Sequence, residues 1–273
     1  MAPRSVLFAV LLIAVSSSSG AAVAQEDLDR FLAAQGCAVG PMTGILADEA
    51  GLDRDALDAI VARATADPAT VRTGDWAILP PSLCVIRPPE VKSRIDVEDP
   101  EVTASTSAID AHAEFGALGC FLDGPAMLER IRASRGWSAD QAHLEYMRFL
   151  AENLRSGDLA FYGNDPLSTP IGFQLLTDRC ANVPQIDDIR EAQALRDENF
   201  DAVIRADAAD VICGRDQSPG PRFMSIVQQQ TDGRNTNAWL ASEFTFMTMG
   251  AGWYTGQSAT EPGTPRPPLC RME

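Results

Sequence analysis

Apolar residues recur at intervals of three and four in several short stretches of the chain, and this spacing is typical of amphipathic helices. Residues 28–35, 54–64 and 144–154 carry the clearest stripes. Residues 187–209 combine the same spacing with many acidic side chains, which predicts one long acidic helix. The pattern therefore predicts a mainly α-helical protein in which short extended segments separate the helices.

Gly-Pro dipeptides stand before three of the short apolar segments, at Gly40-Pro41, Gly124-Pro125 and Gly220-Pro221. Proline suits the first position of a helix because its missing N–H would have no intrahelical partner there, and glycine is acceptable at the N-cap. We therefore predict that a helix begins at each dipeptide. Behind the first one, Met42, Ile45 and Leu46 predict a short amphipathic helix.

Two similar octapeptides, VRTGDWAI at 71–78 and LRSGDLAF at 154–161, lie behind predicted second helices. Glycine is the residue that most readily adopts the left-handed conformation that ends a helix. We therefore predict that Gly74 and Gly157 each end a helix and lead into an extended segment. Ser138 and Gln141 are spaced as a capping box at the start of the second of these helices.

The cysteines indicate how the chain is closed into units. The chain has six, and six cysteines allow fifteen pairings. Cys37, Cys120 and Cys213 are each followed, after the same 36 intervening residues, by a glycine. Because glycine is only about 7% of average composition, chance coincidence is improbable. We predict the disulfides Cys37–Cys84, Cys120–Cys180 and Cys213–Cys270.

These spacings predict three tandem disulfide-closed helical repeats. The predicted units are residues 25–86, 109–183 and 200–273. Residues 87–108 form a proline-rich and charged linker, predicted to be a flexible joint, and residues 184–199 form a helical linker. The third unit diverges most from the other two.

The first 24 residues are typical of a secretory signal peptide. Arg4 precedes an apolar run from Val6 to Val15, and a small-residue stretch ends at Ala22-Val23-Ala24. This layout predicts cleavage after Ala24. The apolar run is too short to span a bilayer, so we expect no membrane anchor after cleavage. Export and an even number of cysteines predict a periplasmic or secreted protein with disulfide bonds.

Composition narrows the range of partners. The formal net charge is −16, and removing residues 1–24, whose only charge is Arg4, makes it −17 (−16 − 1). Such a surface repels phosphate backbones and anionic lipid headgroups, which argues against nucleic-acid and membrane-surface binding. The chain has only two histidines, His112 and His143, so a histidine-rich metal site is excluded. No metal and no cofactor are predicted.

Candidate catalytic and binding residues are few. The nucleophile elbow, the zinc-protease helix motif and the phosphate loop are all absent from the sequence. Asp75 and Asp158 follow the two turn glycines, and two converging carboxylates could hydrolyse a glycan. Aspartate is also ordinary in turns, and we favour that interpretation. Trp76 could stack on a sugar ring, although its position after the turn favours packing in the core. Asp75, Trp76 and Asp158 are therefore the candidates for ligand binding.

Residues 37–80 resemble a LysM module. The likeness rests on Gly51-Leu52, on Asp55 through Ile60, on Thr73-Gly74-Asp75 and on Ile78-Leu79-Pro80. GPMTGIL stands where that family usually has a Gly-Asp-Thr-Leu-like turn. The resemblance implies a β-α-α-β unit that binds N-acetylglucosamine polymers such as peptidoglycan. It places the recognition surface between residues 40–44 and the loop before Thr73.

Together these features predict an exported, non-catalytic binding or interaction protein of the bacterial envelope or exterior. Its partner would be cell-wall glycan or another envelope protein. One alternative is a carboxylate-based glycan hydrolase, because such sites leave weak marks in a sequence. The other is a structural protein that assembles through its helices.

Overall fold

The computed structural model describes residues 19–107, 119–161, 172–183, 186–215 and 221–273. Helices dominate it, as the periodicity predicts. They are α1 (Ser19–Ala34), α2 (Thr43–Glu49), α3 (Arg54–Ala66), α4 (Pro100–Thr103), α6 (Gly124–Arg135), α7 (Ala139–Ser156), α8 (Ile186–Ala208), α9 (Pro221–Gln230) and α10 (Leu240–Gly250). A short 3-10 helix covers Asp178–Cys180.

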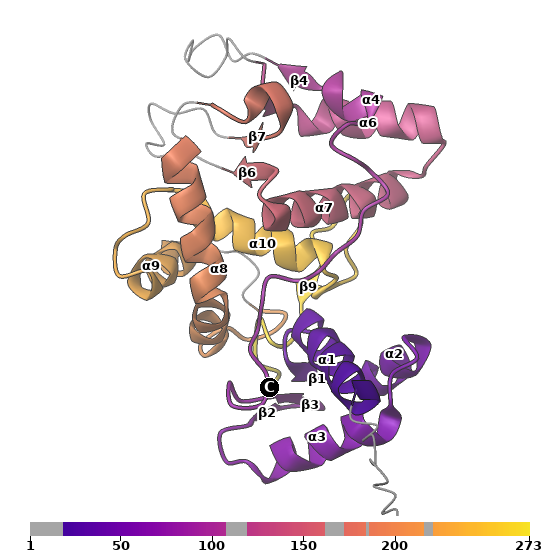
Figure 1. The fold of residues 1–273 in the computed structure, drawn as a ribbon, viewed down its shortest axis with the longest axis vertical. Coiled ribbons are helices and arrows are strands. Elements are labelled where there is room, and N and C mark those ends of the chain that lie inside the picture. Colours follow the sequence, from indigo (N-terminus) through magenta and orange to yellow (C-terminus); the bar gives the residue numbers. More distant parts are fainter. Residues whose placement is uncertain (1–18, 108–118, 162–171, 184–185, 216–220) are drawn as a thin grey trace, which may run out of the picture.

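The strands are short and lie in small antiparallel sheets (Figure 1). One sheet has the order β1-β3-β2, a second the order β4-β5-β7-β6, and β8 pairs with β9. The strands are β1 (Ala38–Val39), β2 (Val71–Thr73), β3 (Trp76–Ile78), β4 (Thr106–Ser107), β5 (Phe121–Leu122), β6 (Leu159–Phe161), β7 (Phe173–Leu175), β8 (Tyr254–Thr255) and β9 (Thr264–Pro265). In the first two sheets, the strand after the opening cysteine pairs with the last strand, and two helices connect it to the hairpin.

The three predicted disulfides are all present. Cys37 bonds Cys84, Cys120 bonds Cys180, and Cys213 bonds Cys270, with sequence separations of 47, 60 and 57. In the first two, a cysteine immediately before β1 or β5 is joined to one that follows the last strand of the same sheet. Each bridge therefore closes its own segment of chain.

The buried core runs through all three segments of the chain. A single hydrophobic cluster contains Leu57 from the first segment, Phe149 from the second, and Phe244 and Trp253 from the third. Helices α7 and α10 approach each other closely at Gly250, where an added Cβ would lie 2.3 Å from the Met147 carbonyl oxygen. The disulfide-closed segments therefore share one core.

Most predicted helix signals are where the sequence indicates. Asp53 caps α3 by accepting from the amides of Asp55 and Ala56, and Ser138 and Gln141 form the predicted capping box of α7. Gly157 ends α7 in the left-handed region with φ 86°. Gly124-Pro125 begins α6, behind the N-cap Asp123.

The first Gly-Pro prediction is wrong by two or three residues. α2 begins at Thr43, because the Thr43 hydroxyl accepts a hydrogen bond from the Gly40 amide at 2.8 Å and closes a turn over Pro41. At the third dipeptide, α9 begins at Pro221, while Gly220 lies outside the described residues.

Gly74 does not end a helix, contrary to the prediction. α3 has already ended at Ala66, because Asp67 precedes a proline and takes an extended conformation, with ψ 121°. Gly74 instead lies in the two-residue turn of the β2–β3 hairpin, where Thr73 pairs with Trp76. Its φ of 54° suits glycine at the first position of such a turn. The similar octapeptides therefore occupy different structural places.

The apolar face of α2 points outward. Met42 is 55% exposed, Ile45 49% and Leu46 37%, whereas Thr43 and Ala47 are buried. The spacing of three and four predicts a helix here correctly, but the predicted apolar stripe is exposed and the small residues Thr43 and Ala47 pack inward. We call Met42, Ile45 and Leu46 the α2 face.

The predicted flexible joint is an ordered segment. Residues 92–101 contact α6 and α7, and Ile95 and Val102 belong to the core. Glu152 of α7 accepts hydrogen bonds from the Lys92 ammonium and the Ser93 amide, both at 2.7 Å. Charge and proline content suggest a linker, but buried isoleucine and valine side chains and carboxylate hydrogen bonds hold it in place.

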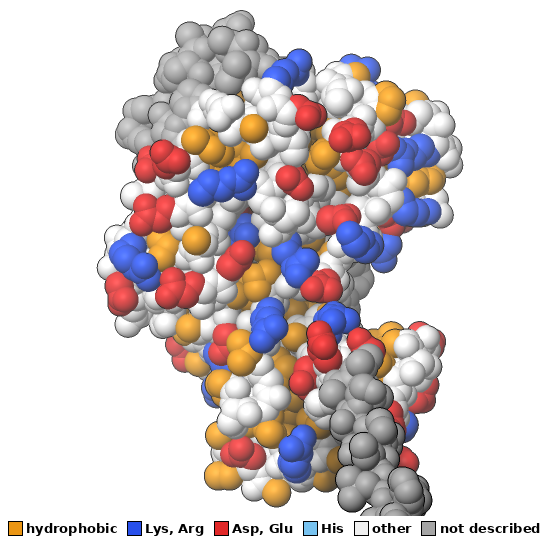
Figure 2. Space-filling model, in the orientation of Figure 1, with side chains coloured by type: hydrophobic (Ala, Val, Ile, Leu, Met, Phe, Trp, Pro, Cys, Tyr) orange, Lys and Arg blue, Asp and Glu red, His pale blue; other side chains and the backbone are white. Residues whose placement is uncertain are grey.

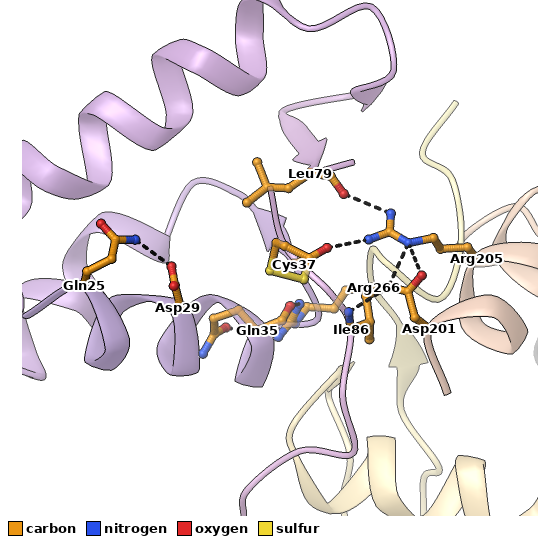
Figure 3. The surroundings of a disulfide bond; sticks show 10 residues. Gln25, Asp29, Gln35, Cys37, Leu79, Ile86, Asp201, Arg205 and Arg266 are labelled. Carbon is orange, nitrogen blue, oxygen red and sulfur yellow. Dashed lines mark hydrogen bonds and ion pairs between the residues drawn. A yellow bond between two sulfur atoms is a disulfide. The ribbon is translucent and has the colours of Figure 1, made fainter. Parts of the chain in front are cut away.

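The first segment is tied to the rest of the molecule around its disulfide (Figure 3). Arg205 of α8 donates to the carbonyl oxygens of Leu79 and Cys84, at 2.9 and 3.0 Å, and Asp201 accepts from the Ile86 amide at 2.7 Å. α8 runs without a break across the predicted boundary at residues 199–200. These contacts join the first segment to α8.

The carboxyl end of α1 is capped by residues from the far end of the chain. The Trp253 indole donates to the Ala34 carbonyl oxygen at 2.8 Å, and Arg266 donates to both carbonyl groups of Gln35. Cations and donors near a helix carboxyl end satisfy its free carbonyl groups. Burial lowers the pKa of Arg266 to about 10.

Within the described part of the chain, none of the helices has the length and hydropathy needed to span a bilayer.

Candidate functional site

Asp75 and Trp76 lie at the β2–β3 turn. Asp75 is exposed, and Trp76 is half-buried. The indole ring covers Gly40, where an added Cβ would lie 2.5 Å from ring atoms, and the Arg266 guanidinium lies 5.3 Å from the ring centroid. Both contacts occupy surface that a stacked sugar would need. Trp76 therefore packs between strand β1 and the C-terminal segment.

Asp158 lies between α7 and β6, beside a cleft of about 450 Å³. Its carboxylate accepts a hydrogen bond from the Ser156 hydroxyl at 2.6 Å. The lining of this cleft includes Asp96, Asp99 and Glu152 but not Asp75. Figure 1 shows why, since β6 lies in the upper half of the molecule and the β2–β3 hairpin in the lower half. The structure does not bring Asp75 and Asp158 together.

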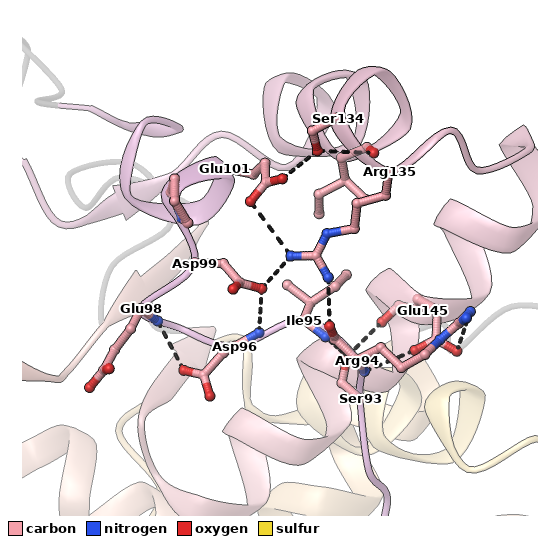
Figure 4. A network of polar contacts seen from close by, with 12 residues as sticks. Ser93, Arg94, Ile95, Asp96, Glu98, Asp99, Glu101, Ser134, Arg135 and Glu145 are labelled. Atoms are coloured by element: carbon pink, nitrogen blue, oxygen red, sulfur yellow. Dashed lines mark hydrogen bonds and ion pairs between the residues drawn. The ribbon is translucent and has the colours of Figure 1, made fainter.

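Carboxylates in this cleft and beside it have partners within the chain (Figure 4). Arg135 reaches from α6 to Asp99 and also pairs with Glu101, and Asp99 accepts from the Asp96 amide at 2.8 Å. Hydrogen bonds from Ser134 and Arg135 lower the pKa of Glu101. These carboxylates hold residues 93–101 against α6 and α7, which is the arrangement of an anchored segment.

Glu145 is the most deeply buried of the carboxylates that hold this segment. It is 2% exposed, accepts from the Arg94 amide at 3.1 Å, and pairs with the Arg94 and Arg148 side chains. Burial alone would raise the pKa of Glu145, but these hydrogen bonds and charges outweigh it and hold the pKa below its ordinary value. Glu145 therefore stays ionised as an anchor for Arg94.

The remaining tryptophans have packing roles. Trp253 is fully buried in the core. Trp137 lies beneath two guanidinium groups, those of Arg94 at 4.4 Å and Arg135 at 5.2 Å. Trp239 meets the ring of Phe161 edge-on at 6.0 Å, and its indole N–H is buried without a partner.

His143 lies half-buried on α7. Its Nε2 is 3.3 Å from the side-chain nitrogen of Gln257, and burial lowers its pKa. His112 lies outside the described residues. In the described ranges there is no group of three or more His, Cys, Asp and Glu side chains that could hold a metal ion.

A buried ion pair joins α8 to α10. Arg196 and Glu243 are each 1% exposed, and the guanidinium Nη1 lies 2.7 Å from the carboxylate. The second Glu243 oxygen accepts from the Phe161 amide at 2.9 Å, which ties the end of β6 to the pair. Burial raises the pKa of Glu243, and the charge of Arg196 and the hydrogen bonds from Phe161 and Arg196 act in the opposite direction.

Sequence reasoning missed this pair, although one signal was present. Ile189, Ala192, Phe200 and Val203 define the buried stripe of α8, and Arg196 occupies the same stripe. A charged residue inside an apolar stripe indicates either a break in the helix or a buried partner. The partner itself, 47 residues away, leaves no local mark.

A second cleft, of about 490 Å³, lies between α1 and residues 81–90. Three arginines line it, Arg30, Arg87 and Arg155, together with three carboxylates. Arg30 pairs with Glu26, and Arg155 pairs with Glu90 at 2.7 Å. Figure 2 shows the same intermixing of basic and acidic side chains over this whole face of the molecule. The cleft has no excess of either charge among its lining residues.

Comparison with known proteins adds no relative: no protein-family model, no curated protein and no solved structure matches this chain.

Proposed function

We propose that the protein is an exported, non-catalytic binding protein of the bacterial envelope or exterior, with peptidoglycan glycan as its first candidate ligand. The three disulfides support an oxidising compartment, because such bonds persist outside the cytosol. The segments they close would be copies of one unit. The common order of strands and helices in the first two supports that interpretation.

The observation that carries the proposal is the exposed α2 face. Large apolar side chains grouped on a surface often mark a site of interaction, because apolar surface left in water does not stabilise the isolated protein. Ile45 and Leu46 lie on this seven-residue helix, and Met42 is its N-cap. They adjoin residues 40–44, the region that the LysM resemblance assigns to sugar recognition. Apolar side chains can pack against the C–H faces of sugar rings.

The hydrolase alternative is less well supported. The cleft beside Asp158 has four carboxylates among its lining residues, and each accepts a hydrogen bond from its own chain. For Asp96, the donor is the Glu98 amide at 3.0 Å. A hydrolase needs one carboxylic acid and one carboxylate on either side of the scissile bond. Release of reducing ends from peptidoglycan, abolished in Asp158→Asn, would establish the hydrolase instead.

Co-sedimentation with purified peptidoglycan tests the binding proposal on the full mature chain. The double variant Met42→Ser/Ile45→Ser should lose binding at least tenfold. The matched control is Met224→Ser, since Met224 is 46% exposed on α9 and remote from α2 in sequence. Binding should persist in moderate salt, because the acidic surface offers no attraction that salt could screen.

Absence of sedimentation by a folded wild-type chain would discard the glycan and leave an envelope protein as the partner. A solution mass above that of the monomer, reduced in the α2 double variant, would favour the structural-assembly alternative.

A further inference from the structure

The predicted signal-peptide cleavage point lies inside a helix of the structure. α1 runs from Ser19 to Ala34, so a cut after Ala24 leaves Gln25 as the first residue of the remaining helix. The first side chain that the core holds is Leu28, followed by Leu32, both 1% exposed. Gln25 is exposed and precedes this anchor by less than one turn. The new terminus is therefore held close to the core but remains open to solvent.

The charges around this terminus are already paired. Glu26 and Asp27 each lie 3.1 Å from the Arg30 guanidinium, and Asp29 accepts from the Gln25 carboxamide at 2.7 Å (Figure 3). Cleavage would place an α-ammonium group at the amino end of α1. The partial positive charge of the helix N–H groups disfavours a cation at that end. Loss of the terminal charge would therefore favour the helix.

We propose that Gln25 is a modification site, where the mature protein carries an N-terminal pyroglutamate; this inference rests on the export proposed above. The neutral α-amino group attacks the side-chain carbonyl carbon of the same residue. A bond forms between the α-nitrogen and Cδ, the bond between Cδ and Nε2 breaks, and Nε2 leaves as ammonia with the displaced proton. The reaction is intramolecular and needs no oxidant, reductant or added group.

The conditions for this step are met at neutral pH. An α-amino group has an ordinary pKa of about 7.7–8.0, so roughly a tenth of it is the uncharged nucleophile at pH 7. Closure requires the hydrogen bond from the Gln25 carboxamide to Asp29 to open, and this contact lies on an exposed surface. The product has no terminal amine, so its charge is lost and aminopeptidases have no substrate group.

Intact mass measurement tests the inference on protein purified from the periplasmic fraction of bacteria that express the full chain. The expected mass is that of residues 25–273 less one ammonia and, for the three disulfides, six hydrogens. The matched variant Gln25→Asn keeps a terminal carboxamide but would need a four-membered ring. It should show its full uncyclised mass and lose its first residue to an aminopeptidase, which the wild type resists.

The outcomes separate this inference from the export proposal. A mature chain that begins at Gln25 with an unmodified amine overturns the pyroglutamate and leaves export standing. A chain that retains the residues before Gln25 overturns the export proposal and the inference together. Equal mass loss in wild type and Gln25→Asn would assign the loss to another position and overturn Gln25 as the site.

Discussion

Single residues decide how the helices of this protein are joined. Arg196 and Glu243 compensate each other's charge in the core, where neither could be buried alone. Arg196 also donates to Asp197, and Glu243 also accepts from the Phe161 amide. A buried ion pair contributes little net stability compared with well-packed apolar residues, but the loss of one partner leaves an uncompensated charge in the core. The pair therefore specifies which face of α8 meets α10.

Replacing one member of this pair should be strongly destabilising. Arg196→Met leaves the Glu243 carboxylate buried without its cation, and we expect a loss of about 3–5 kcal/mol in the free energy of unfolding. The double variant Arg196→Met/Glu243→Met should recover most of that loss. Urea denaturation of the single and double variants measures both effects, and additive losses would mean that the two residues do not interact.

Glu145 should make the protein sensitive to acid. Because its folded pKa lies below the ordinary value of 4.5, its stabilising contribution is fully present above pH 4.5 and is lost as the pH falls through the folded pKa. The stability difference between wild type and Glu145→Gln should therefore be largest near neutral pH and shrink below pH 4.5. Denaturation from about pH 7 to about pH 3 gives this curve. A difference that grows with acid would contradict it.

At the scale of helices and strands, glycines at positive φ decide where elements end. Gly157 (φ 86°) stops α7, and Gly74 (φ 54°) turns the β2–β3 hairpin. Gly136 (φ 65°) ends α6 in open space, with no atom within 4 Å of an added Cβ. Substitutions at these three positions can therefore distinguish the cost of backbone strain from the cost of steric crowding.

We expect Gly74→Val and Gly157→Val each to cost more than about 1 kcal/mol, since a Cβ is strained in the left-handed region. At Gly157 the added carbon would also lie 2.6 Å from the Arg190 guanidinium. Gly136→Val should show the strain without the crowding, and so a smaller loss than Gly157→Val. Thermal unfolding compares the three, and unchanged midpoints would contradict the strain argument.

The disulfides act on the same scale. Cys120 and Cys180 close a loop with a sequence separation of 60 across the second sheet. Loop-closure entropy assigns this bridge about 4 kcal/mol of stabilisation through the unfolded chain. Cys120→Ala/Cys180→Ala should lower the free energy of unfolding by that order. Non-reducing peptide mapping should find the other two bridges unchanged, and a re-paired cysteine would show that the segments do not close independently.

At the scale of the whole molecule, the segments depend on one another. Trp253 and Arg266 cap α1 from the far end of the chain, and α8 holds residues 79–86. We expect one cooperative unfolding transition for the full chain, because the shared core cannot lose one segment without exposing apolar surface of the others. An early separate transition in calorimetry would contradict this expectation.

The contact between α8 and the first segment can be tested locally. Asp201→Ala removes the acceptor of the Ile86 amide and the carboxylate that orients Arg205. Hydrogen exchange at Ile86 should then become at least tenfold faster. The control is Glu198→Ala on the same helix, because Glu198 is exposed and lies 3.6 Å from Arg234. Equal exchange in both variants would show that Asp201 does not protect this amide.

Sequence alone determined the features that depend on neighbours along the chain. The capping box at Ser138, the helix end at Gly157 and the long helix α8 follow from local hydrogen bonding and periodicity. The disulfide pairs also follow, because each cysteine is matched within its own segment. These features need no knowledge of what lies across the core.

Tertiary structure decided what depends on distant partners. The pairing of β2 with β3 makes Gly74 a hairpin turn, and packing of Thr43 and Ala47 turns the α2 face outward. Buried contacts made an ordered segment of a proline-rich linker. The Arg196–Glu243 pair and the separation of Asp75 from Asp158 are likewise set by how distant segments pack. A sequence pattern predicts which side chains are buried, but only the tertiary structure determines which residues each of them contacts.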